Sequence, residues 1–406
     1  MNETDDLLRA IANDPTNKDL RLSYAATLED TGGPHARRRA ECIRVQYAVQ
    51  ACRDLYISES HPGFQELLLR ETELLVHAKQ WLTPETRDLA RSNCSYSWGG
   101  EKDYAQFRRG FVEHIAPRDL RALPRLLPAL LEQWPILSLT CSVWNKQEAR
   151  DVLQRKGDFH KQMIAALDAL PENRFRELGL WFAEPATIER MLPKSGNLET
   201  LILYSPFPGA LREIAKAAAQ LPALKALQIR HAWPVDGSTA ALRRELLECS
   251  ETVLAEQLEE WSVAHLDSPG VLLDCLSSRQ WKQLKRLSFH RCGIINSGGL
   301  LHLATLRGIT LHSLELKDRW SADDPIDCNM LFPLQELLTE PIGWMLRKLA
   351  LKQLGTMGGV AENSFCDGLE SHQQLYNFSC DEEITSAALA KSQRVVLGRT
   401  PPLPTY

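Results

Sequence analysis

The chain has 406 residues, of which 44% are hydrophobic and 24% charged, and its formal net charge is −5. These values are typical of a soluble globular protein and argue against a dedicated nucleic-acid binder, which usually has a basic excess. No apolar run approaches the roughly 18 residues that a membrane span needs, and the acidic N-terminus does not resemble a signal peptide. We therefore expect a cytoplasmic protein. Its ten cysteines are scattered without a Cys-x-x-Cys pair, which predicts reduced, buried thiols.

The first 82 residues are predicted to form four short helices. Thr4 and Asn17 are residues of the kind that cap helices, and apolar residues at helical spacing follow each of them. Pro15 ends the first of these helices, and the Gly32–Gly33 pair ends the second. A third helix is expected from about His35, and a fourth over residues 63–82.

This stretch resembles the repeat-companion domain, a short bacterial module, over about forty residues. It departs from the module's usual pattern at Ala26–Thr27, where Asp-Trp is common, and at Cys42. The module has no established enzyme activity, and the resemblance implies that leucine-rich repeats follow. Residues 107–115 also resemble the strand that comes after the module. The matching positions are Leu7, Leu8, Ala10, Ile11, Asp14, Pro15, Arg21, Leu22, Tyr24, Ala25, Leu28, Glu29, Gly32, Arg39, Glu41, Ile43, Arg44 and Gln46.

A burst of basic residues, Arg37 to Arg39, opens the third expected helix. These arginines either bind phosphate or serve the structure, paired with nearby carboxylates such as Glu29 and Glu41 or solvated. Three arginines in an acidic chain are weak support for nucleic-acid binding, so we expect no nucleic-acid partner.

The rest of the chain contains a recurring pattern of apolar residues, Leu-x-x-Leu-x-Leu, in which other apolar residues replace some leucines. Its matches begin 23 to 41 residues apart, and a spacing of about 20 to 29 is typical of leucine-rich repeats. The last two apolar positions alternate along a short strand, so both face one side. The nine matches begin at Trp134, Phe175, Leu198, Leu224, Leu258, Leu284, Leu311, Leu346 and Leu375.

The fold expected is α/β, a leucine-rich-repeat solenoid with parallel strands and a helical convex side, preceded by an α-helical module. Helical periodicity between the strands, as in residues 209–222 and 297–308, supports this interpretation. A final strand is expected at 394–397. The segments expected are 1–91 for the module, 92–133 for a connecting strand, helix and N-terminal cap, 134–397 for the repeats and 398–406 for a proline-rich tail. Because an open solenoid end needs a cap, the module either closes the array or forms a second docking surface.

Residues that flank the two core positions of each match are predicted to line the concave face. They form an aromatic patch early in the array and a basic patch later, and exposed aromatics and arginines are the residues most enriched at interface hot spots. The candidate protein-binding residues are Trp181, Phe182, Tyr204, Arg230, Arg286, His290, Arg291, Lys317, Lys348 and Lys352.

The sequence contains little that indicates catalysis or cofactor binding. The sequence has no nucleophile elbow, zinc-protease motif or phosphate-binding glycine loop, so we expect no enzyme activity and no cofactor. Cys366 lies near His372, but no oxyanion element accompanies them. His231, His265 and His290 occupy similar places in successive repeats without a clear metal-ligand pattern, so no metal site is predicted.

Two hypotheses for function follow. The first is a non-catalytic scaffold that binds another protein, one with an acidic patch, through the concave face. The alternative is a regulatory subunit or protease substrate in a bacterial signalling or defence module, recognised through an insertion such as 318–341 or the segment 141–174. The sequence alone does not name the partner.

Overall fold

The computed structural model describes most of the chain, which consists of two compact units. The N-terminal unit comprises Met1–Leu55, Pro62–Leu198 and Leu403–Tyr406, and the C-terminal unit comprises Tyr56–His61 and Glu199–Pro402. The described residues are 3–82, 105–117, 119–143, 146–154, 158–230, 239–266, 269–278, 281–294, 299–306, 308–317, 335, 337–340, 342–343, 345–352, 360–380 and 387–403.

The N-terminal unit combines the expected helices with four strands. Its α-helices are α1 (Glu3–Asn13), α2 (Lys18–Thr31), α3 (Pro34–Asp54), α4 (Pro62–Leu75), α6 (Leu123–Gln133), α7 (Lys146–Leu153), α8 (Phe159–Asp168) and α9 (Pro185–Met191). Its strands are β1 (Ala105–Arg108), β2 (Phe111–Ile115), β3 (Ser138–Cys141) and β4 (Glu177–Trp181), and short 3-10 turns cover Ala78–Gln80, Leu120–Ala122 and Leu192–Lys194.

The helix boundaries follow from local chemistry. The Asn17 side chain accepts a hydrogen bond from the Leu20 amide at the start of α2, which confirms the predicted cap. Gly32 and Gly33 separate α2 from α3, and α3 begins with Pro34, a residue suited to the first turn. The fourth helix ends at Leu75 rather than at residue 82, and a 3-10 turn follows.

Strands β1 and β2 form an antiparallel hairpin at the start of the sheet. Arg109 and Gly110, its two turn residues, have φ values of 53° and 75°, the left-handed pair that a two-residue hairpin turn requires. A Cβ atom on Gly110 would lie 2.1 Å from Cγ1 of Ile43 on α3, so glycine also permits the close approach of this helix. The segment 107–115 is thus a hairpin rather than the single strand expected. Strand β2 then pairs in parallel with β3, and β3 with β4.

The C-terminal unit alternates strands with helices. Its strands are β5 (Thr200–Tyr204), β6 (Ala226–Arg230), β7 (Glu260–Ala264), β8 (Arg286–His290), β9 (Ser313–Lys317), β10 (Lys348–Lys352) and β11 (Asn377–Cys380). Its helices are α10 (Ala210–Lys216), the 3-10 turn Ala218–Gln220, α11 (Thr239–Ser250), α12 (Val253–Gln257), α13 (Pro269–Ser277), α14 (Gly299–Thr305), α16 (Val360–Ser371) and α17 (Ala387–Leu397).

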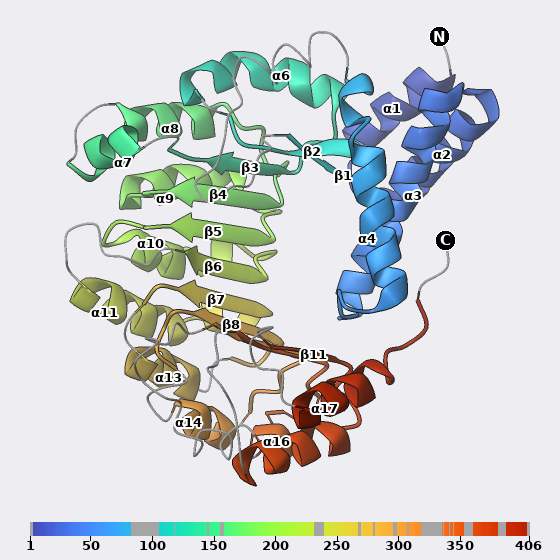
Figure 1. Ribbon diagram of the computed structural model, residues 1–406. Helices are drawn as coiled ribbons and strands as arrows, with labels where there is room; N and C mark the ends of the chain where they lie inside the picture. The colour runs from blue at the N-terminus through green and yellow to red at the C-terminus, as the bar shows by residue number, and fades with distance from the viewer. Residues whose placement is uncertain are drawn as a thin grey trace. The chain divides into compact units, whose positions relative to one another are not determined.

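All seven strands of this unit pair in parallel, in the order of the sequence. The predicted core leucines are aligned across them and buried, with exposed fractions of 2% or less at Leu201, Leu227, Leu287, Leu314 and Leu349. Helices α10, α11, α13 and α14 follow one another along one side of the strands (Figure 1). The nine predicted strands, β3 to β11, are therefore confirmed, and the protein belongs to the α/β class with predominantly parallel strands.

One expectation is wrong, at the C-terminal end of the repeats. Residues 394–397 belong to α17 and do not form a final strand. The segment 141–174 is largely helical, since it contains α7 and α8. The helical module forms one compact unit together with β1–β4, and most of the insertion 318–341 lies outside the described residues. No helix in the described ranges is long and apolar enough to cross a membrane.

Candidate functional site

The strands of the C-terminal unit carry the candidate site on the sheet face opposite to the buried leucines, here called the outward face. Strand register aligns their first, third and fifth residues into three rows. The first row is Thr200, Ala226, Glu260, Arg286, Ser313, Lys348 and Asn377. The middle row is Ile202, Gln228, Ser262, Ser288, Glu315, Ala350 and Ser379, and the last row is Tyr204, Arg230, Ala264, His290, Lys317 and Lys352.

A polar group that we call the Glu315 cluster lies on β8, β9 and β10. The Glu315 carboxylate pairs with Lys317 on the same strand, and its second oxygen lies 4.0 Å from Nζ of Lys348. Nε2 of His290 lies 3.7 Å from the carboxylate and 2.8 Å from the Ser288 hydroxyl. Two lysines and a histidine therefore share one carboxylate.

The ionisation of Glu315 follows from these neighbours. Partial burial acts to raise the pKa of its carboxyl, but the hydrogen bond from Lys317 and the charges of Lys317, Lys348 and His290 outweigh this effect and lower the pKa below its ordinary value. The carboxylate is thus held ionised, and the side chain remains 21% exposed. The cluster therefore contains ionised side chains that remain partly exposed to solvent.

The first row is less accessible at its later strands because the segment Tyr56–His61 packs there. The Asn377 side-chain amide donates to the Tyr56 carbonyl at 2.9 Å, and the Tyr56 ring meets His312 edge-on at 6.4 Å. Ile57 and Ser58 are each only 2% exposed. Tyr56 adopts a left-handed backbone conformation with φ 58°, which is uncommon for a residue with a side chain.

Arg286 lies in this covered region and is already paired. Its guanidinium donates to the Glu260 carboxylate at 2.7 Å, and it also hydrogen-bonds with the Tyr56 side chain. Burial acts to lower the pKa of Arg286, but the Glu260 charge and the hydrogen bonds raise it above its ordinary value. The predicted basic patch is therefore corrected to a surface of mixed charge, in which Glu260 and Glu315 lie among the cations.

Tyr204 and Arg230 form the opposite end of the last row. The Arg230 guanidinium lies 5.8 Å from the Tyr204 ring centre, in the range of a cation–π contact, and donates to the Gln228 side chain at 2.9 Å. Arg230 is exposed, and no carboxylate pairs with it among the described residues. Tyr204 is half-buried, so one aromatic ring and one cation are accessible together.

The aromatic residues at the end of β4 belong to the N-terminal unit. Trp181 is half-buried and meets Phe182 edge-on at 6.0 Å. Phe182 follows the strand in a left-handed backbone conformation (φ 51°) and is only 5% exposed. The prediction that Phe182 lies on the surface is therefore wrong.

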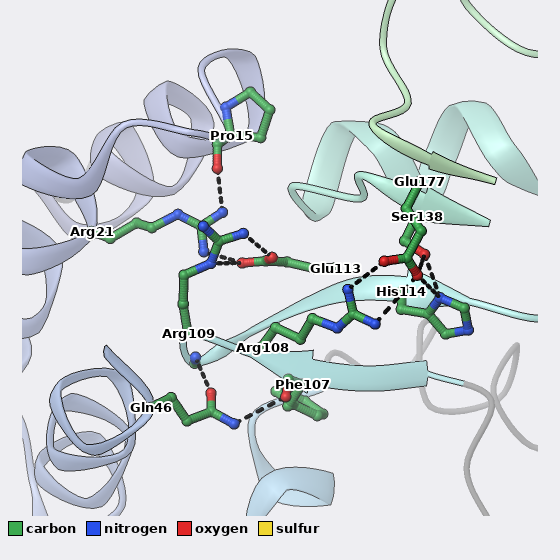
Figure 2. A network of polar contacts seen from close by, with 11 residues as sticks. Pro15, Arg21, Gln46, Phe107, Arg108, Arg109, Glu113, His114, Ser138 and Glu177 are labelled. Carbon is green, nitrogen blue, oxygen red and sulfur yellow. Dashed lines mark hydrogen bonds and ion pairs between the residues drawn. The ribbon is translucent and has the colours of Figure 1, made fainter. Parts of the chain in front are cut away.

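A polar row also crosses the N-terminal unit, where His114, Ser138 and Glu177 are aligned on β2, β3 and β4 (Figure 2). Ser138 Oγ lies 2.5 Å from Nδ1 of His114 and donates to Glu177 at 2.6 Å, and Arg108 contacts both Glu177 oxygens. Burial lowers the pKa of His114 to about 4, so the imidazole is neutral at physiological pH. Ser138 is 1% exposed, which keeps its hydroxyl from any large substrate.

A second network, the hairpin network, joins the helical module to β1 and β2 (Figure 2). Glu113 on β2 accepts hydrogen bonds from Arg21 on α2 and from Nε of Arg109 at 3.0 Å. Gln46 on α3 donates to the Phe107 carbonyl at 3.0 Å and accepts from the Gly110 amide at 2.6 Å. Arg21 and Gln46 are both positions of the repeat-companion resemblance, so these motif residues hold the hairpin.

Among the basic residues at the start of α3, Arg39 has a structural role that neither sequence interpretation anticipated. Arg39 is 8% exposed and donates to the Tyr24 hydroxyl at 2.9 Å. Its guanidinium lies within 5.5 Å of the ring centres of Tyr24, Phe111 and Trp134. Arg37 is exposed, and the carboxylate of Glu29 pairs instead with Arg44.

The other candidates are spread over the molecule. Arg291 follows β8 and is exposed, whereas the side chain of Lys352, like His231 as a whole, lies outside what the structure describes. His265 is half-buried beside β8, and no set of three possible metal ligands gathers in the described ranges. His372 contacts the Gly343 carbonyl and the Leu375 amide through its two ring nitrogens, so neither nitrogen is available to activate Cys366.

Sequence reasoning missed two contributors to the candidate site. Glu315 occupies the middle position of its strand, and that position carries the carboxylate that organises the later cations. Tyr56 lies outside the repeats, in the connection between α3 and α4, and no local pattern connects it with β8 or β11. Listing all three outward positions of each strand would have found Glu315.

Comparison with known protein families finds none that matches the chain, and comparison with characterised proteins finds no relative.

Proposed function

We propose that the protein is a non-catalytic leucine-rich-repeat scaffold that binds another protein through the outward, concave face of its parallel strands. Support comes from the parallel strands at repeat spacing, each with aligned core leucines and with helices between them. The observation that carries the proposal is the outward face itself. Its three aligned rows contain Tyr204, Arg230 and Arg286, partly exposed residues of the types most enriched at interface hot spots.

The charge of this face favours an acidic partner. The described side chains of its rows include four cations, Arg230, Arg286, Lys317 and Lys348, and two carboxylates, Glu260 and Glu315. The chain as a whole has a net charge of −5, so the positive surplus is local. A complementary acidic patch would speed association at low ionic strength. A bacterial, cytoplasmic setting in signalling or defence agrees with the repeat-companion resemblance.

For the helical module we propose the role of an N-terminal cap. Its Gln46 side chain forms hydrogen bonds with the Phe107 carbonyl and the Gly110 amide, at the hairpin that begins the sheet. Unpaired edge groups are a template for aggregation, and covering them is a common protection. The alternative, a second docking surface, predicts that removal of residues 1–91 leaves cooperative unfolding intact.

The test is covalent capture followed by affinity measurement. A photo-crosslinking amino acid at position 202, in the middle row of β5, is used to capture the partner from the native host. The partner is then purified and its affinity measured for the parent chain, Tyr204→Ala and Lys216→Gln. Tyr204→Ala should weaken binding about 30-fold, the equivalent of about 2 kcal/mol for an interface hot spot. Lys216 lies on α10, away from the outward face, and its substitution should have no effect.

The result also separates the two functional hypotheses. If Tyr204→Ala and Lys317→Glu leave the affinity unchanged while replacement of residues 318–341 abolishes binding, the outward face is not the recognition surface. The protein would then be the recognised object, as expected of a regulatory subunit or protease substrate.

A further inference from the structure

Positive charge on the outward face is concentrated at two separate points. Arg230 on β6 is exposed and held by Tyr204 and Gln228, with no carboxylate paired to it among the described residues. The second point is the Glu315 cluster, in which two lysines and a histidine share one carboxylate. An anionic group of a partner would find surplus positive charge at both points.

The strand between them carries small, uncharged side chains. On β7, the middle and last rows are occupied by Ser262 and Ala264. Glu260, the carboxylate of this strand, lies in the first row and is engaged by Arg286 and Gln228. No negative charge of the last two rows therefore separates Arg230 from the Glu315 cluster.

The distance between the two points matches a simple sequence spacing. Strands β6 and β9 are three strand positions apart, which corresponds to about 14 Å at about 4.8 Å per position. An extended chain rises about 3.4 Å per residue, so residues four apart are also separated by about 14 Å. Because extended side chains alternate between two sides, residues four apart face the same way.

We propose, on the basis of the proposed function, that the outward face binds an extended acidic segment of another protein, with two carboxylates four residues apart. One carboxylate contacts Arg230, and the other contacts Lys317 and Lys348. At the second point the incoming carboxylate takes the place that Glu315 occupies in the unbound protein. Glu315 is thus an internal competitor, which weakens binding and keeps the lysines paired until a partner arrives.

The experiment uses fluorescently labelled peptides and the full chain at low ionic strength. The probe contains two glutamates four residues apart in a serine–glycine background. One control peptide has the two glutamates adjacent, and a second has lysines in their place. Fluorescence anisotropy should show tighter binding of the spaced glutamates than of either control. Equal binding of the adjacent pair, tighter binding of the lysine peptide, or no binding at about 1 mM peptide, an affinity below about 4 kcal/mol, would overturn the inference.

Variants test the role of Glu315 directly. Glu315→Gln should tighten binding of the spaced peptide by up to about five-fold, since it removes one partly exposed competing charge. Arg230→Gln and Lys317→Gln should weaken binding by similar factors, and Glu213→Gln on α10 is the matched control, because Glu213 pairs with Lys216 away from the face. Weaker binding by Glu315→Gln contradicts the inference. The proposed function then survives if the captured partner still loses affinity on Tyr204→Ala, and fails if it does not.

Discussion

Two carboxylates of this protein, Glu113 and Glu315, are each shared by several cations, but they differ in burial. Glu113 is 2% exposed at its side chain and its partner Arg21 is fully buried. Glu315 is 21% exposed, and its partners Lys317 and Lys348 are 27% and 34% exposed. In the N-terminal unit the ion-pair partners of the carboxylate are fixed, because loss of one of them leaves a buried charge unpaired. In the C-terminal unit the ion-pair partners are exchangeable, because water or a binding partner can replace any one of them.

The largest loss of stability is expected from Glu113→Ala. This change leaves the buried Arg21 guanidinium without its counter-charge and should cost about 3–5 kcal/mol of unfolding free energy. Glu315→Ala is the matched comparison and should cost less than about 1 kcal/mol, as is usual for exposed ion pairs. Chemical denaturation of both variants measures the difference. Equal losses would show that burial does not separate the two sites.

A second prediction compares the loss of stability caused by substitutions on the two faces of strand β8. Leu287→Ala removes a fully buried side chain from β8 and should cost about 2–5 kcal/mol. Its neighbour Ser288 lies on the outward face, and Ser288→Ala should change stability by less than about 0.5 kcal/mol. Thermal melts of both variants test this assignment, and a strongly destabilised Ser288→Ala would contradict it.

A third, smaller effect concerns the contact between the module and the hairpin. Gln46→Leu keeps the volume of the side chain but removes its hydrogen bonds to Phe107 and Gly110. The loss should be about 1–3 kcal/mol, the cost of leaving buried polar groups unpaired. Gln50→Leu on the exposed side of α3 is the control. If both variants unfold alike, Gln46 does not hold the hairpin.

The last expected effect is a change in the pH dependence of stability. Folding lowers the pKa of His114 from 6.5 to about 4, so the unfolded chain binds more protons between these values. Stability should therefore fall as the pH decreases from about 6.5 to about 4. His114→Gln should flatten this part of the profile. An unaltered slope in His114→Gln would assign the acid sensitivity to other groups.

Much of the fold was predictable because it depends on local periodicity. The apolar triplets placed nine strands, since each triplet alternates as a buried strand must, and Asn17 identified a helix start through capping chemistry. The hairpin was missed because its turn uses Arg109–Gly110 instead of the more familiar Asn-Gly. The strand expected at 394–397 failed because its short apolar run, Val395 and Val396, fits a helix face equally well.

The candidate site was less predictable because side-chain pairing is not local. The sequence places Arg286, Lys317 and Lys348 on one face but does not reveal that Glu260 and Glu315 neutralise part of their charge. Phe182 and Arg291 each follow the last residue of their strands and share a left-handed backbone, yet Phe182 is buried and Arg291 is exposed. The position in the repeat therefore does not decide burial. The contacts of Tyr56 involve residues more than 200 positions away, which no sequence window connects.

The segment Tyr56–His61 has a consequence for the order of events during synthesis. Asn377, which donates to the Tyr56 carbonyl, is 321 residues further along the chain. At about 5–20 residues per second, the ribosome makes that partner roughly 15 to 60 seconds after the segment. Until then, the Tyr56 carbonyl lacks this hydrogen bond. We therefore expect a protease to cut chains interrupted before residue 377 near Tyr56 more readily than complete chains.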